Sequence, residues 1–109
     1  MNWVRGGEGG PVPFFMKYLH KDVNSGQVAM LVRYSAGIVN PAHRHSFGHG
    51  IYVLQGKLVT HRGTFGPGTF VWFPPNEVVF HGASPDEDLV ILFLRHQDMD
   101  TEHVQSTPR

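Results

Sequence analysis

"NPAHRHSFGHGIYVLQG", residues 40–56, places three histidines directly before a run of β-forming residues. Side chains two residues apart lie on the same face of an extended chain, so His43, His45 and His49 share one side. A fourth imidazole would have to come from another strand, and His81, at the end of the apolar run EVVFH, is the candidate. Converging neutral imidazoles are common nitrogen ligands of transition metals. The competing interpretation is a set of polar histidines that lead into a strand and bind nothing.

The composition is typical of one small globular domain. The chain has 109 residues, of which 40% are hydrophobic and 12% aromatic, enough for a single core and too few for two. Nine basic residues balance nine acidic ones, so charge gives no reason to expect nucleic acid or an anionic membrane as a partner. A small-molecule substrate is expected instead. The lack of cysteine excludes disulfides, thiolate ligands and a cysteine nucleophile.

The first residues and the apolar runs indicate where the protein is located, and the edges of its predicted strands indicate how it assembles. The first residues lack the basic and apolar regions of a signal peptide, and no apolar run approaches the length of a membrane span. We therefore expect a cytoplasmic protein. Its predicted strands have more free edges than the short termini can cover, and two-fold dimers are the commonest oligomers, so a homodimer is expected.

Glycines and prolines divide the chain into short segments rich in β-branched and aromatic residues, which predicts an all-β sandwich or barrel. Strands are expected over residues 14–19, 27–34, 49–55, 57–61, 69–73, 78–81 and 89–95. Turn residues at 24–26, 55–57, 66–68 and 74–76 suggest a meander of hairpins. The expected domain is the whole chain, 1–109, with a core over about 14–95, a polar C-terminal tail over 97–109, and residues 1–12 frayed or packed over an edge.

The frame around the histidines resembles the first motif of the cupin superfamily. That motif runs Gly, five residues, H-x-H, three or four residues, Glu, six residues, Gly. Here Gly37 begins it, His43 and His45 form the H-x-H, and Gly56 ends it, with every spacing kept. The one departure is His49, which stands in the place of the Glu.

The second cupin motif is matched less completely. Gly68 and Pro74 have the expected five-residue spacing, and the resemblance implies that His81 is the metal ligand that ends this motif. Asn76 stands where Gly is usual, and Val79 stands where His is usual. The two motifs together extend the resemblance over most of the chain.

The resemblance implies a double-stranded β-helix, a jelly-roll-like cupin barrel with the metal inside. It is closest to four-histidine metal cupins and to small cupin dioxygenases that cleave acetylacetone or hydroxyacetophenones. It therefore implies one divalent transition metal ion, with iron or manganese favoured over zinc, nickel or copper, and a dioxygenase that cleaves a carbon–carbon bond in a small apolar ketone, β-diketone or aromatic compound. Two alternatives stay open: a non-redox cyclase or isomerase, and a non-catalytic small-molecule-binding cupin.

An apolar pocket is expected beside the histidines, because Ile51 and Val53 share the phase of His49 and Val79 shares that of His81. The pocket candidates are Phe47, Ile51, Val53, Trp72, Phe73, Val79 and Phe93. Each of them also suits an ordinary barrel core. Tyr52 has the opposite phase to His49, which argues against a catalytic phenol at that position.

Overall fold

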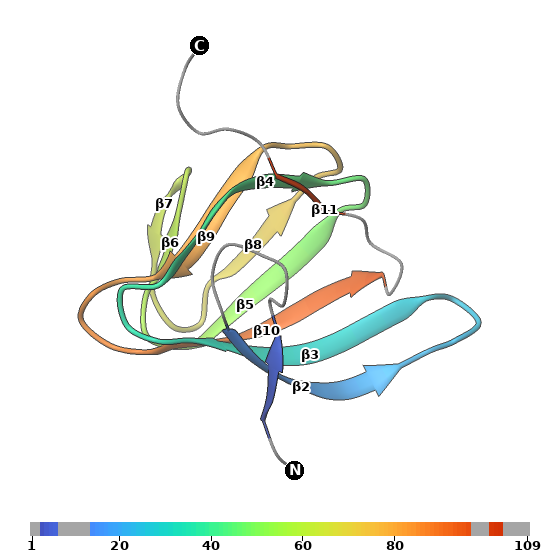
Figure 1. Ribbon diagram of the computed structural model, residues 1–109, viewed down its shortest axis with the longest axis horizontal. Coiled ribbons are helices and arrows are strands. Elements are labelled where there is room, and N and C mark those ends of the chain that lie inside the picture. The colour runs from blue at the N-terminus through green and yellow to red at the C-terminus, as the bar shows by residue number, and fades with distance from the viewer. Residues whose placement is uncertain (1–2, 7–13, 97–100, 104–109) are drawn as a thin grey trace.

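The computed structural model describes residues 3–6, 14–96 and 101–103, which form two antiparallel β-sheets (Figure 1). The first sheet has six strands, in the order β1 (Val4–Gly6), β2 (Phe14–Lys21), β3 (Gln27–Tyr34), β10 (Leu89–His96), β5 (His49–Gln55) and β8 (Phe70–Phe73). The second has five, in the order β11 (Thr101–His103), β4 (Val39–His45), β9 (Val79–Ala83), β6 (Leu58–Thr60) and β7 (Gly63–Phe65). The described residues include no helix, and so none able to cross a membrane. The predicted all-β, jelly-roll-like fold is confirmed.

The core lies between the two sheets, where alternate side chains of each strand point inward. Figure 1 shows the sheets as two layers, with β2, β3 and β10 low in the view and β4, β9, β6 and β7 above them. In β3 the inward residues Val28, Met30, Val32 and Tyr34 are buried, and the residues between them are not. The other strands complete the core with Ile51, Val53, Leu58, Val71, Phe73, Val79, Ala83, Leu89, Ile91 and Phe93.

The suggested meander is wrong, because three of the four predicted turns carry the chain from one sheet to the other. The turns at 55–57, 66–68 and 74–76 join β5 to β6, β7 to β8 and β8 to β9, and each pair is split between the sheets. Of these four predicted turns, only the one at 24–26 closes a hairpin, between β2 and β3. Turn residues indicate where a chain reverses, but the partner of each strand is decided by which faces pack together.

Strand β4 was not predicted, although it carries two of the three clustered histidines. Pro41 has no N–H to donate to a neighbouring strand, and strands usually tolerate proline only at edges or bulges. The structure shows such an irregularity: the register of β4 against β9 shifts between Asn40 and His43. The bulge accommodates Pro41 and leaves the segment that ends at His45 extended.

Short edge strands were also missed. Val4–Gly6, Gly63–Phe65 and Thr101–His103 each have three residues and add to an edge of a sheet. Thr101–His103 pairs with β4 and is the described part of the predicted polar tail. The rest of that tail, and residues 1–2 and 7–12 of the segment expected to be frayed or packed over an edge, lie outside the described residues.

Candidate metal centre

The fold brings four histidine rings together between the two sheets. His43 and His45 come from β4 and His81 from β9, both in the second sheet, and His49 is the first residue of β5 in the first sheet. The ring centres of His45 and His43 are 5.1 Å apart, those of His43 and His81 4.9 Å, those of His81 and His49 6.3 Å, and those of His49 and His45 5.0 Å. The four imidazoles therefore form a closed ring of neighbours.

Three of these rings are buried almost completely. His43, His49 and His81 are only 1–2% exposed, and His45 is half-buried. The His43 Nδ1 atom lies 2.7 Å from the Pro41 carbonyl oxygen, to which it donates as an N–H, and in that tautomer Nε2 keeps its lone pair. His81 Nε2 and both ring nitrogens of His49 are buried without a hydrogen-bond partner among the described residues.

His49 and His81 favour their neutral form. Burial lowers the pKa of His49 to about 3, and the neighbouring rings of His45 and His43 add to that shift, while the Phe47 backbone opposes it. Burial likewise holds the pKa of His81 well below its usual value. Buried polar atoms are normally satisfied, and neutral imidazole nitrogens are good metal donors. An ion between these rings would therefore satisfy nitrogens that nothing else in the described chain satisfies.

The rings are not arranged around a ready coordination sphere. No three His, Asp or Glu side chains among residues 3–6, 14–96 and 101–103 already have their donor atoms placed to hold an ion. Binding an ion here requires the donor atoms of the cluster to turn toward a common point by small side-chain adjustments.

Tyr34 is a site residue that the sequence analysis missed. Its hydroxyl lies 3.4 Å from Nδ1 of His81, and burial raises the pKa of the phenol above its usual value, so that it stays protonated. This contact holds one nitrogen of His81, and Nε2 is buried without a hydrogen-bond partner among the described residues. The available signal was alternation, because Tyr34 continues the inward phase of Val28, Met30 and Val32 in β3.

Two predicted pocket residues, Phe73 and Phe93, flank His49. Their ring centres lie 5.1 and 5.2 Å from that of His49, with interplanar angles of 27° and 18°. Both phenyl rings also lie 6.4 Å from the centre of His81. Ile51, Val53 and Val79 belong to the adjoining buried core. The inner wall of the site is therefore apolar and aromatic.

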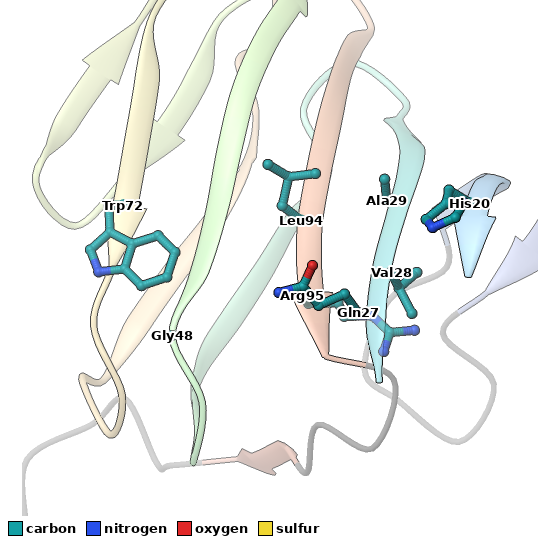
Figure 2. A pocket seen from close by; sticks show the side chains of 8 residues that line it. All are labelled: His20, Gln27, Val28, Ala29, Gly48, Trp72, Leu94 and Arg95. Atoms are coloured by element: carbon teal, nitrogen blue, oxygen red, sulfur yellow. The ribbon is translucent and has the colours of Figure 1, made fainter. Parts of the chain in front are cut away.

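Trp72 and Phe47 are not brought to the histidines. Trp72 points to the outer face of the first sheet and is 51% exposed, and Phe47 is 43% exposed in the loop between β4 and β5. Tyr52 also lies on the outer face, as its phase predicts. Trp72 borders a shallow groove of about 250 Å³ there, shown in Figure 2 and lined by His20, Gln27, Val28, Ala29, Gly48, Trp72, Leu94 and Arg95. This groove is separate from the four histidines.

A polar cluster borders the site on the side of Phe73. Arg62 donates from Nε and Nη2 to the two carboxylate oxygens of Glu77, at 3.0 and 2.5 Å, and His61 Nε2 lies 2.5 Å from the same carboxylate. The Arg62 hydrogen bond holds the pKa of Glu77 below its usual value. The guanidinium also lies 5.0 Å from the Phe73 ring centre. The cluster thus ties the turn after β6 to the loop before β9, against the phenyl ring that stacks on His49.

Comparison with known proteins finds a family model that matches most of the chain. The family model of the ChrR cupin-like domain matches residues 1–100. The DNA damage-repair/toleration protein DRT102 of Arabidopsis thaliana is 29% identical over 85 residues, which are 72% of this chain and 27% of that protein. The chain thus spans about a quarter of the length of this curated relative.

Two solved structures extend the comparison. A cupin-like protein from Thermotoga maritima is 30% identical, with a TM-score of 0.74 over 86% of this chain and 77% of that one. The polyketide cyclase RemF from Streptomyces resistomycificus is 23% identical, with a TM-score of 0.72 over 86% of this chain and 72% of that one. At that identity the similarity to RemF shows a shared fold alone.

Proposed function

The chain belongs to the family of ChrR cupin-like domains, and we propose that His43, His45, His49 and His81 together bind one divalent transition metal ion. The observation that carries this assignment is the set of buried ring nitrogens without partners, Nε2 of His81 and both nitrogens of His49, inside a closed group of four imidazoles. Iron and manganese are the ions that the cupin resemblance favours, and imidazole also suits zinc, nickel and copper.

The donor set favours a negatively charged guest. Four neutral imidazoles cancel none of the charge of a divalent ion, whereas a carboxylate ligand would cancel part of it. An enolate or phenolate that offers two oxygens suits such a centre. The carbon skeleton of that guest would lie against Phe73 and Phe93, which favours a small apolar ketone, β-diketone or aromatic compound.

The bound ion would supply Lewis acidity toward a substrate oxygen and, with a redox metal, electron transfer toward dioxygen. The chain's own residues orient the ligands and keep water out. The Pro41 carbonyl holds Nδ1 of His43, and the Tyr34 hydroxyl contacts Nδ1 of His81, so that both rings can present Nε2 to the ion. The apolar walls limit the access of water to a reactive guest.

The leading reaction is dioxygenase cleavage of a carbon–carbon bond, with both oxygen atoms entering the products. A second candidate, metal-dependent cyclisation or isomerisation without oxygen, is favoured by the shared fold with the cyclase RemF. The two reactions use the same centre and differ in their need for a redox metal and for dioxygen.

The test begins with metal content. Protein purified without oxygen is reconstituted with Fe²⁺, Mn²⁺ or Zn²⁺, and we expect about one ion per chain. The His43→Ala/His45→Ala variant should lose that ion. The control His20→Ala, which removes a histidine at the outer groove, should keep it. Full metal content in the double variant would overturn the assignment.

The reaction is then assigned with acetylacetone and an aromatic hydroxyketone as probes, by following oxygen uptake and products by mass spectrometry. Oxygen consumption that requires Fe²⁺ or Mn²⁺ supports the dioxygenase. Turnover by the zinc form at an unchanged rate without oxygen supports the cyclase or isomerase instead. Retention of a probe without any product indicates a binding cupin and contradicts both enzymatic assignments.

A further inference from the structure

His49 differs from the other buried histidines of the centre in how its ring is held. The Pro41 carbonyl accepts a hydrogen bond from His43, and the Tyr34 hydroxyl contacts His81. Neither ring nitrogen of His49 has such a partner among the described residues. Its ring is held by stacking on Phe73 and Phe93.

The two phenyl rings reach His49 from opposite sides. Strand β5 lies between β8 and β10 in the first sheet. Phe73 of β8 is directly across from His49, and Phe93 of β10 is across from Ile51, one inward position further along β5. All three side chains point inward and are buried. The imidazole is therefore enclosed between two aromatic rings in nearly parallel planes, which we call the phenyl clamp (Phe73 and Phe93).

We propose that the phenyl clamp fixes the ring plane of His49 and selects a neutral imidazole over a carboxylate at this position, an inference that rests on the metal centre proposed above. The face of a phenyl ring is the negative side of its quadrupole. A planar neutral imidazole stacks well on that face, whereas a carboxylate between two such faces is repelled and has lost its water. The clamp thereby keeps the ligand set uncharged, and the positive charge of the ion is left for the guest.

The first experiment measures Co²⁺ affinity of the metal-free protein from the visible absorption of the bound ion. Phe73→Leu and Phe93→Leu each remove one aromatic face while keeping an apolar side chain, and each should weaken Co²⁺ binding about ten- to a hundredfold, the usual effect of losing a group that orients a ligand. The matched control is Phe80→Leu. It makes the same substitution at a phenylalanine that packs against His61, which is not one of the four proposed ligands, with ring centres 5.9 Å apart. The control should leave the affinity unchanged.

The second experiment tests the choice of ligand. His49→Glu is made in the wild-type chain and in the Phe73→Leu/Phe93→Leu chain. We expect His49→Glu to bind Co²⁺ at least about tenfold more tightly in the leucine background than beside the intact clamp. Leucine has no negative ring face to repel the carboxylate, and the effects of residues in contact are not additive. An equal effect of His49→Glu in both backgrounds would overturn the selection of imidazole. Unchanged affinity in both single leucine variants would overturn the orienting role.

Folding and the metal centre itself are checked separately. Thermal melts of the metal-free variants identify any that do not fold. If Phe73→Leu fails to fold, Phe93→Leu gives the same comparison, since Phe93 is 7% exposed while Phe73 is fully buried, and a fall in affinity for Phe93→Leu supports the clamp. Failure of the wild-type chain to bind Co²⁺ contradicts the proposed centre. Binding by the wild type and equally tight binding by the leucine variants contradicts the clamp alone.

Discussion

The Tyr34 hydroxyl lies 3.4 Å from Nδ1 of His81, so the last residue of β3 in one sheet contacts a histidine of β9 in the other. Both side chains are only 2% exposed. The contact joins the two sheets at the histidine cluster and orients one of its rings. It makes the position of His81 depend on the packing of the whole barrel.

Tyr34→Phe should therefore weaken the fold and the metal centre together. The substitution leaves Nδ1 of His81 buried without its partner, which costs about 1–3 kcal/mol. Urea unfolding of the metal-free protein should show that loss, and Co²⁺ affinity should fall because the His81 ring is no longer oriented. The phenyl ring itself is retained, so its contact with Phe14, at 5.5 Å between ring centres, provides no alternative cause. Unchanged unfolding and unchanged affinity would contradict this role of Tyr34.

Acidification should destabilise the metal-free protein already below pH 6.5. The pKa of His49 is about 3 in the folded chain and about 6.5 when unfolded. Between these pH values the unfolded chain binds a proton that the folded chain does not. The contribution of His49 to the free energy of unfolding is therefore fully present above about pH 6.5 and declines as the pH falls toward 3. One such histidine contributes at most about 1.4 kcal/mol per pH unit.

Urea unfolding between pH 7.5 and 4.5 measures this dependence. His49→Gln should flatten the decline, since the glutamine amide does not titrate. His20→Gln, at the outer groove, is the matched control and should keep the full slope. A slope that is the same in His49→Gln and in the wild type would show that this ring does not carry the effect.

Gly82→Ala should separate β4 from β9. A Cβ atom at residue 82 would collide with the Ile38 carbonyl oxygen and the Val39 Cα, and a backbone cannot move aside as a side chain can. Overpacking of this kind costs about 1–3 kcal/mol, and displacement of β9 would also move His81 away from the other histidines. The variant should melt earlier and bind Co²⁺ more weakly.

Gly66→Ala is the control for that substitution. A Cβ atom at residue 66 meets no atom within 4 Å, and the residue does not have a positive φ. Its melting temperature and Co²⁺ affinity should match those of the wild type. Equal behaviour of Gly82→Ala and Gly66→Ala would contradict the close approach of β4 and β9.

Glu77→Gln should lower stability by up to about 1 kcal/mol, because it removes the charge that Arg62 and His61 share. The Glu77 side chain is 25% exposed, so added salt should reduce the difference from the wild type. The matched control is Asp86→Asn, which breaks a 3.6 Å pair with Lys57 between side chains 70% and 57% exposed. Chemical denaturation in low and high salt checks both, and an equal loss in the two variants would contradict the structural role of the cluster.

The sequence alone predicts features that depend on local periodicity. Turn residues between β-branched segments indicate an all-β fold, and alternation places Tyr52 on the opposite face from His49, as the structure confirms. The H-x-H spacing is equally local, so the common side of His43 and His45 follows from the extended chain. Strand β4, which carries them, was not predicted because proline is unusual inside a strand, and Pro41 fits there only through a bulge against β9.

The tertiary structure decides which residues meet. Phe73 and Trp72 are neighbours in sequence, yet only Phe73 reaches His49, since the pairing of β8 with β5 turns one inward and the other to the outer groove. The contact of Tyr34 with His81 likewise joins residues 47 positions apart. Strand partners and register are chosen when two apolar faces pack against each other, and a shift of one residue would exchange the two faces of a strand. The sequence therefore determines the alternating strands and the histidine spacing, while packing of the two sheets determines what surrounds those histidines.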